Sequence, residues 1–281
     1  MKDLTQFCAE GATFSEQMIS VNEHVRLRLI SFKAAHKTAN PPVVLVAGWI
    51  SMISGWKEVL REMTKDFDVR YLETREKVSS KIDGRVEYGA EDIGQDIIDV
   101  VSLLGLKDGG YILFGSSLGA TAILDCHQNL LQKPKCMVLI GPNAVFRVPK
   151  MGMVVIYLTW PPLYLMIRPV VKWYLRNFRL DIKSDYKQYE KYSNALDAAD
   201  PWKLKRAVVK LSKYQVWDLL KNIATPTLIV GASKDVLHEP QNLLMMVDKM
   251  PHATYLDMET NASTHSKDMV IQLRDYLKTL Y

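Results

Sequence analysis

The chain has 281 residues, of which 48% are apolar and 24% are charged, and its formal net charge is +5. This composition is typical of a globular protein and excludes a disordered chain. The basic residues are spread along the sequence, whereas a nucleic-acid interface would need a patch or a stripe of them.

Three cysteines, Cys8, Cys126 and Cys136, show neither metal-ligand nor paired spacing, and they predict free thiols in a reducing compartment. The first residues lack the charged and then apolar segments of a secretory signal. We therefore expect a cytoplasmic protein.

Apolar runs predict seven strands, followed or preceded by helices. The first run alternates apolar and polar residues and predicts a half-exposed edge strand, whereas the other runs predict central parallel strands covered on both faces. The alternation of strands and helices predicts the α/β class, with a mostly parallel sheet and helices on both faces. The strands are expected at 25–32, 43–47, 69–72, 111–114, 137–140, 227–230 and 253–256, and the helices at 55–67, 87–104, 121–132, 240–249 and 267–280.

The alternation stops between residues 143 and 220, a region rich in Trp, Tyr, Lys, Met and Pro. We interpret 143–220 as a helical lid inserted into a core formed by 1–142 and 221–281. Its segment 153–167 is apolar, but a spanning helix needs about 20 apolar residues, and two prolines at 161 and 162 would break it. The segment is expected to pack as a lid or to dip into an interface.

The sequence Gly-Ser-Ser-Leu-Gly at 115–119 lies between a predicted strand and a predicted helix, the setting that the G-x-S-x-G pattern requires. Gly115 and Gly119 would let the strand and the helix pass closely. Ser117 would then project at the carboxyl edge of the sheet, beside a helix N-terminus, as a candidate nucleophile. Ser116 does not fit the glycine spacing.

Two further residues follow strands that end at the same edge. Asp235 comes after the next-to-last predicted strand, and His265 comes after the last one and a polar loop. The chain order Ser117, Asp235, His265 is the order expected with a nucleophile elbow. The histidine would take the serine proton and the carboxylate would orient the imidazole. Asp257 and Glu259 are the nearest rivals for the acidic role.

With these motifs the chain resembles the α/β-hydrolase fold superfamily from about residue 25 to 280. The elbow carries most of the resemblance, and the Ala47-Gly48-Trp49 stretch with Trp56 resembles the family's turn after the third strand. The resemblance implies a twisted, mostly parallel sheet of about eight strands with a helical lid. It also implies that the backbone N–H groups of Trp49 and Leu118 form an oxyanion hole.

The sequence departs from the family pattern at three places. Ala47 replaces the common histidine, the Glu-Thr-Arg-Glu sequence at 73–76 replaces an Asp-Arg-x-Gly turn, and Thr264 replaces the usual glycine before the last histidine. Serine at 117, where some relatives carry aspartate, favours acyl transfer over epoxide opening or halide removal. Carbon–carbon bond cleavage and cofactor-free peroxidase chemistry are less frequent alternatives.

We therefore expect a serine hydrolase that cleaves a carboxylic ester or a thioester through an acyl-enzyme. The apolar and aromatic residues of the lid predict an apolar acyl group, and no metal or organic cofactor is implied. Two alternatives stay open: an acyltransferase or thioesterase acting on a carrier-bound acyl group, and a non-catalytic ligand-binding member of the fold.

The lid also carries Arg168, Lys172, Arg176 and Arg179. We interpret these residues as a solvated face, with contact to an anionic membrane surface or to a phosphate-bearing carrier as the alternative.

Overall fold

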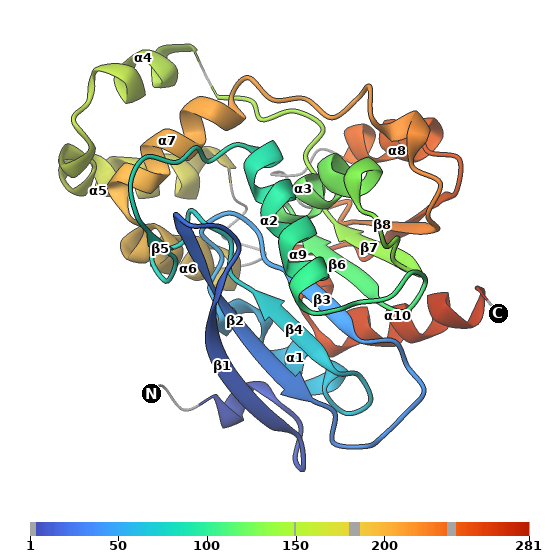
Figure 1. The fold of residues 1–281 in the computed structure, drawn as a ribbon. Coiled ribbons are helices and arrows are strands. Elements are labelled where there is room, and N and C mark those ends of the chain that lie inside the picture. Colours follow the sequence, from blue (N-terminus) through green and yellow to red (C-terminus); the bar gives the residue numbers. More distant parts are fainter. Residues whose placement is uncertain (1–3, 149, 180–185, 235–239, 281) are drawn as a thin grey trace.

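The computed structural model describes residues 4–148, 150–179, 186–234 and 240–280 (Figure 1). Its strands are β1 (Thr13–Ser20), β2 (Val25–Lys33), β3 (Val43–Val46), β4 (Val69–Leu72), β5 (Lys81–Ile82), β6 (Ile112–Ser116), β7 (Cys136–Ile140), β8 (Thr227–Gly231) and β9 (Ala253–Asp257). They form one sheet in the order β1-β2-β4-β3-β6-β7-β8-β9, with β5 paired to β2. The predicted α/β class is thereby confirmed.

The sheet is mostly parallel. The pairs β4–β3, β3–β6, β6–β7, β7–β8 and β8–β9 are all parallel, whereas β1–β2, β2–β4 and β2–β5 are antiparallel. The register aligns the strand ends, with Val46 opposite Gly115, and Ser116 opposite Ile140. The loops that leave the parallel strands therefore meet at a single edge of the sheet.

The strand expected at the edge is β2, and that prediction was wrong. β1 lies outside β2 and pairs with it from Thr13↔Lys33 to Ser20↔Arg26. Alternation of apolar and polar residues indicates that one face of a strand is buried. It does not indicate whether the strand is hydrogen-bonded to a neighbouring strand along both of its edges. The sequence analysis missed β1 because this strand lies at the surface, with no residue fully buried.

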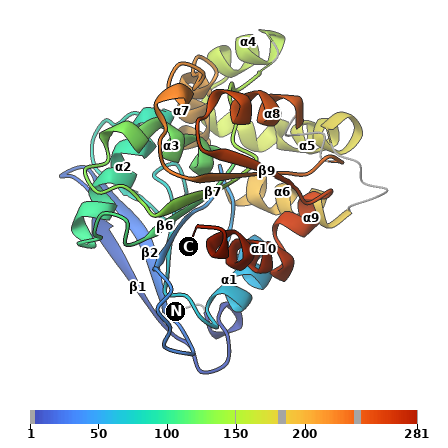
Figure 2. The ribbon, with the colours of Figure 1, turned by 90° about the vertical axis from the view of Figure 1, so that its right-hand side faces the viewer.

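Helices cover both faces of the sheet (Figure 2). On one face lie α2 (Ala90–Leu103), α3 (Leu118–Cys126) and α8 (Pro240–Lys249), and on the other lie α1 (Lys57–Met63) and α10 (Lys267–Lys278). Each turns an apolar stripe to the sheet, as in α10, where Met269, Val270, Leu273 and Leu277 are buried at helical spacing. The predictions of a helix at 240–249 and at 267–280 agree closely with α8 and α10.

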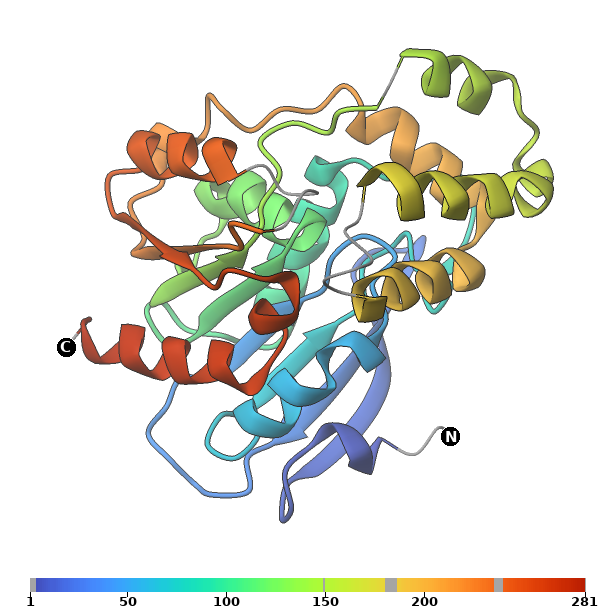
Figure 3. The same ribbon diagram turned by 180° about the vertical axis from the view of Figure 1, so that it is seen from behind.

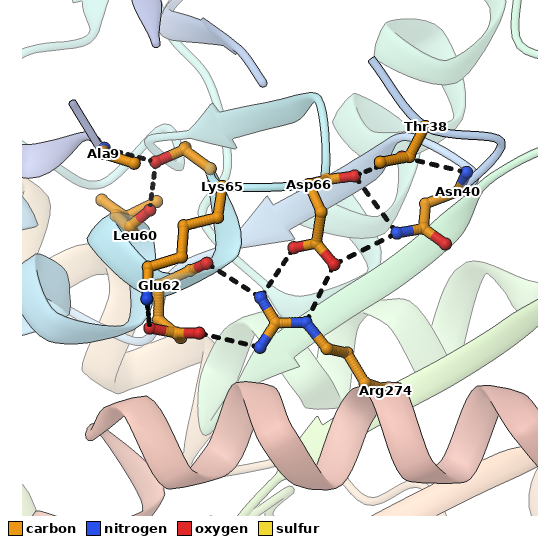
Figure 4. Close-up of polar contacts among 9 residues, drawn as sticks. Ala9, Thr38, Asn40, Leu60, Glu62, Lys65, Asp66 and Arg274 are labelled. Carbon is orange, nitrogen blue, oxygen red and sulfur yellow. Dashed lines mark hydrogen bonds and ion pairs between the residues drawn. The ribbon is translucent and has the colours of Figure 1, made fainter. Parts of the chain in front are cut away.

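Arg274 of α10 forms hydrogen bonds and ion pairs with residues at the end of α1 (Figure 4). Arg274 Nε and Nη2 donate to the two carboxylate oxygens of Asp66 at 2.9 and 2.7 Å, and Nη1 donates to Glu62 Oε1 at 2.8 Å. A planar guanidinium suits such paired contacts because its N–H groups match the spacing of carboxylate oxygens. These contacts join the C-terminal helix to a segment more than 200 residues earlier.

Between β7 and β8 the described residues of 143–220, here called the helical insertion, form helices that gather at one end of the molecule (Figures 1 and 3). These are α4 (Lys150–Leu158), α5 (Tyr164–Tyr174), α6 (Tyr186–Ala198) and α7 (Pro201–Leu211). Pro161 and Pro162 separate α4 from α5. Within the described ranges, no helix has the length and apolarity needed to cross a membrane.

Candidate active site

Ser117 lies at a sharp turn between β6 and α3. Its φ of 49° and ψ of −117° are unusual for a residue with a side chain. A Cβ at Gly115 would lie 2.7 Å from Ala120 Cα, and a Cβ at Gly119 would lie 2.8 Å from Ala47 O. The strand and the helix therefore pass so closely that only glycine fits on either side of the turn.

Two groups from the end of β7 contact Ser117. The Ser117 N–H donates to Ile140 O at 2.8 Å, and Asn143 Nδ2 donates to Ser117 Oγ at 3.0 Å. Asn143 is itself held, because its N–H donates to Thr121 Oγ1 at 2.9 Å. The sequence analysis missed Asn143, which lies three residues after the end of β7 and has no local sequence signature of its own.

His265 packs against Trp56, with 4.4 Å between the ring centroids. Its Nδ1 lies 2.9 Å from Thr264 Oγ1 and 3.1 Å from Asn261 O. The Thr264 hydroxyl donates to the same carbonyl at 2.8 Å. A carbonyl can only accept, so these contacts favour a proton on Nδ1 and make Nε2 the nitrogen that can take up a proton.

The expected polar loop before His265 is in fact one helical turn, α9 (Asn261–Thr264). Thr260 caps it, since its side chain accepts from Ser263 N. Thr264, which stands where the family that the sequence resembles usually has glycine, thus supplies one of the contacts to the imidazole.

Ser117 and His265 line the same small cavity of about 50 Å³, together with Gly48, Trp49 and Asn261. The structure therefore brings together the predicted serine, histidine and Trp49 from three separate loops.

Asp235 lies outside the described residues. Its two rivals do not line this cavity: Asp257 Oδ1 accepts from the N–H groups of Ser233 and Glu259, and Glu259 pairs with Lys234 at 2.7 Å. In the described part of the chain no cluster of three or more His, Cys, Asp or Glu residues could hold a metal ion.

The turn after β3 passes directly over the serine. A Cβ at Gly48 would lie 3.2 Å from Ser117 Cβ. The Gly48 carbonyl accepts from Ser51 N at 3.0 Å and from Lys77 Nζ at 2.6 Å. In a trans peptide the N–H points opposite to the carbonyl, so these two donors fix the direction of the Trp49 N–H. Ile50 completes the turn with a φ of 47°, a strained value for a β-branched residue.

Lys77 belongs to a buried charged loop that the sequence did not predict. Its side chain is 6% exposed and lies 3.5 Å from Glu76 Oε1. Arg75 in the same loop makes a paired contact with Asp96, with both N–O distances 2.7 Å. From α7, Lys203 Nζ donates to Lys77 O at 2.7 Å and to Ser80 O at 2.9 Å. Close partners offset only part of the cost of burying these charges, and burial raises the pKa of Asp96 to about 6 in spite of Arg75.

A larger cavity of about 500 Å³ opens from Ser117 into the helical insertion. Most of its walls are aliphatic or aromatic side chains, and its volume lies in the usual range for small-molecule sites. Its lining includes Ile156, Tyr164, Val171, Leu196 and Leu204.

No protein-family model matches the chain, and no curated protein matches it significantly. Solved structures match it well in shape. An esterase from Thermogutta terrifontis aligns over 95% of this chain and 99% of its own, with a TM-score of 0.73 and 16% identity. A bromoperoxidase from Bacillus anthracis covers 95% of this chain and 99% of its own, with a TM-score of 0.72 and 14% identity.

An alpha/beta hydrolase from Sphaerobacter thermophilus covers 92% of this chain and 98% of its own, with a TM-score of 0.70 and 17% identity. These structures share the fold of this protein over nearly the whole chain. The chain therefore adopts the α/β-hydrolase fold.

Proposed function

We propose that the protein is a serine hydrolase that cleaves carboxylic esters. The observation that carries this proposal is the strained Ser117, which shares a cavity with His265 at the end of the sheet. Strain of this kind persists where the surrounding structure enforces it, and it is concentrated at functional sites. An esterase among the structures of similar shape agrees with this chemistry.

In the proposed reaction, Ser117 Oγ attacks the acyl carbon while His265 Nε2 takes the serine proton. The tetrahedral intermediate collapses, its bond to the leaving oxygen breaks, and His265 gives its proton to that oxygen. Water then attacks the acyl-enzyme with His265 as the base, releasing the acid and restoring the serine. Asp235 would orient the imidazole and stabilise its charged form, and the Trp56 ring would support the same cation.

The backbone N–H groups of Trp49 and Leu118 are proposed to stabilise the negative oxygen of the intermediate. Leu118 is the first residue of α3, and the first N–H groups of a helix have no partner within it. Losing one such donor typically costs about 3 kcal/mol, or roughly a hundredfold in rate.

We further propose that residues 1–142 and 221–281 form the catalytic core and that 143–220 acts as its lid. The apolar cavity beneath the lid would take the acyl chain, because burial of each CH₂ group there contributes about 0.8 kcal/mol. The substrate is accordingly an ester with an apolar acyl group.

Hydrolysis of p-nitrophenyl esters with two to sixteen acyl carbons tests this function. We expect the rate to peak at one chain length and to fall about a thousandfold or more in Ser117→Ala. A rate that is independent of chain length would contradict the acyl cavity, and activity that survives in Ser117→Ala would contradict the serine mechanism.

The outer face of the lid is proposed to touch an anionic membrane surface. Of the 21 large apolar residues that are exposed in the described ranges, 13 lie between 151 and 178. The sequence from 141 to 180 has six Lys or Arg residues and no Asp or Glu. Two of the six, Arg168 and Lys172, pair with Asp197 of α6 at 3.3 and 2.7 Å, so one carboxylate offsets part of this positive charge. Apolar side chains with basic neighbours suit the boundary between anionic headgroups and acyl chains.

A further inference from the structure

A second cavity, of about 330 Å³, is lined in part by His265. It shares no lining residue with the apolar cavity of about 500 Å³, here called the acyl cavity. The small cavity between them shares Trp49, Ser117 and Tyr192 with the acyl cavity. It shares Lys191, Asn261 and His265 with the second cavity, here called the polar cavity. Ser117 and His265 therefore line a small cavity that connects the acyl cavity with the polar cavity.

The lining of the two spaces differs in chemistry. The polar cavity is lined mainly by hydroxyl, amide and charged side chains, and Met52 and Ala262 are minor apolar parts of its wall. The polar side chains come from the segment around Gly55, from α6 and from α9. They include Ser54, Glu58, Gln188, Glu190, Lys191 and Asn194.

The path of the proton in the proposed reaction indicates which part of the substrate each of the two cavities would bind. Nε2 of the histidine must pass its proton to the leaving oxygen, so the leaving group has to lie on the histidine side of the serine. The acyl chain then extends to the other side, into the apolar cavity. The leaving alcohol therefore enters the polar cavity.

The charges of this cavity restrict which alcohol it can take. Among the described residues of its lining, two are carboxylates, Glu58 and Glu190, and one is an ammonium, Lys191. This balance repels phosphate and carboxylate groups, while the amides and carboxylates can bind hydroxyl groups as donors and acceptors. Ser54, Glu58, Glu190 and Asn194 are exposed, so the cavity opens to solvent and offers the alcohol a way out.

We propose that the substrate is an ester of an apolar acid with a small, uncharged polyol, whose free hydroxyl groups bind in the polar cavity. The proposal rests on the ester hydrolysis proposed above and adds the class of the leaving alcohol. It disfavours carrier-bound thioesters with phosphate groups, since their leaving group is anionic.

Three esters with one acyl chain test the proposal: 1-decanoylglycerol, propyl decanoate and 1-decanoylglycerol 3-phosphate. We expect kcat/KM for the glycerol ester to exceed that for each of the other two by about tenfold or more. In the double variant Glu58→Leu/Asn194→Leu, the preference for the glycerol ester over the propyl ester should fall at least about fivefold. The matched variant Glu23→Leu/Asn129→Leu, at exposed positions that line none of these three cavities, should keep it.

Equal or better hydrolysis of propyl decanoate by the wild type would overturn the polyol assignment and leave ester hydrolysis standing. Preference for the phosphate ester would overturn the charge argument. If the wild type hydrolysed none of the three esters, the proposed function itself would fail.

Discussion

Lys77 is one of two groups that hold the direction of the Trp49 N–H, and Ser51 N is the other. The Lys77 ammonium holds the Gly48 carbonyl at 2.6 Å from within a buried loop. An apolar side chain of similar length would leave Ser51 N as the remaining donor of these two, so the peptide would be held less firmly. Lys77 is therefore a positioning residue for the proposed oxyanion hole.

Lys77→Met is expected to lower kcat about tenfold, equivalent to about 1.4 kcal/mol of barrier, with little change in KM. The reason is that the lost contact orients a donor used in the transition state. Steady-state kinetics and thermal unfolding should be measured together. Lys203→Met, which removes the neighbouring anchor of the same loop, should lower the melting temperature with a smaller loss of kcat. A lower melting temperature for Lys77→Met with unchanged kcat would reduce Lys77 to a structural role.

The sequence could predict the residues that have a local signature. The two glycines around Ser117 predicted that the strand and the helix pass close to each other, and a Cβ at either glycine would clash. Ser117 and His265, both predicted from the sequence, line the same cavity. Lys77 and Asn143 have no such signature, because each acts through a contact with a residue more than 20 positions away. Sequence patterns indicate burial and local turns. The contacts of Lys77 and Asn143 depend instead on which loops the tertiary fold brings together.

At the scale of elements, continuous apolar runs predicted the parallel strands well, because burial on both faces leaves no room for polar residues. The surface strand β1 and the single-turn helix α9 were missed. β1 is held by backbone pairing with β2, and α9 by the Thr260 cap. Neither stabilising feature needs an apolar stripe, which is the signal that the sequence analysis used.

The contacts of Arg274 join α10 to the end of α1 (Figure 4). Arg274, Glu62 and Asp66 do not line the small cavity of Ser117 and His265. Arg274→Met should lower the free energy of unfolding by about 2–3 kcal/mol, because it leaves Glu62 and Asp66 without their shared cation. Urea unfolding would measure this loss, and kcat should stay unchanged. Lys278→Met breaks an exposed pair with Asp275 in the same helix and should cost less than about 1 kcal/mol. Equal losses in the two variants would contradict the account of the contact.

At the scale of the whole molecule, one buried histidine contributes to sensitivity to acid. Burial, with a smaller effect of Lys133, lowers the pKa of His127 to about 4, whereas an unfolded histidine titrates near 6.5. As the pH falls from about 6.5 to 4, the unfolded chain takes up a proton that the folded chain does not. The fold therefore loses stability over this window.

His127→Gln should remove this loss, because glutamine does not titrate and can still bond to Thr225, which lies 2.8 Å from the histidine Nε2. Urea unfolding at pH 7 and pH 4.5 would show the wild type losing about 2 kcal/mol more than the variant. An identical loss in both proteins would mean that His127 is charged in the fold.

The apolar outer face of the proposed lid should bind vesicles of anionic lipid. Leu158 and Met166 are 82% and 75% exposed and do not line the acyl cavity. The double variant Leu158→Ser/Met166→Ser should weaken sedimentation with phosphatidylglycerol vesicles about tenfold, since two side chains leave the headgroup boundary. Leu131→Ser, at a site 87% exposed outside the lid, is the matched control. Undiminished binding by the double variant, or equal binding to neutral vesicles, would contradict a basic and apolar docking face.

Covalent labelling tests the nucleophile most directly. A fluorophosphonate reacts with a serine whose proton is taken by a neighbouring base, and it stays bound because hydrolysis of the adduct is slow. Intact-mass and peptide analysis should show one adduct per molecule on the peptide that contains Ser117, and none in Ser117→Ala. An unlabelled wild type that still cleaves esters, or an adduct on another residue, would contradict the assignment of Ser117.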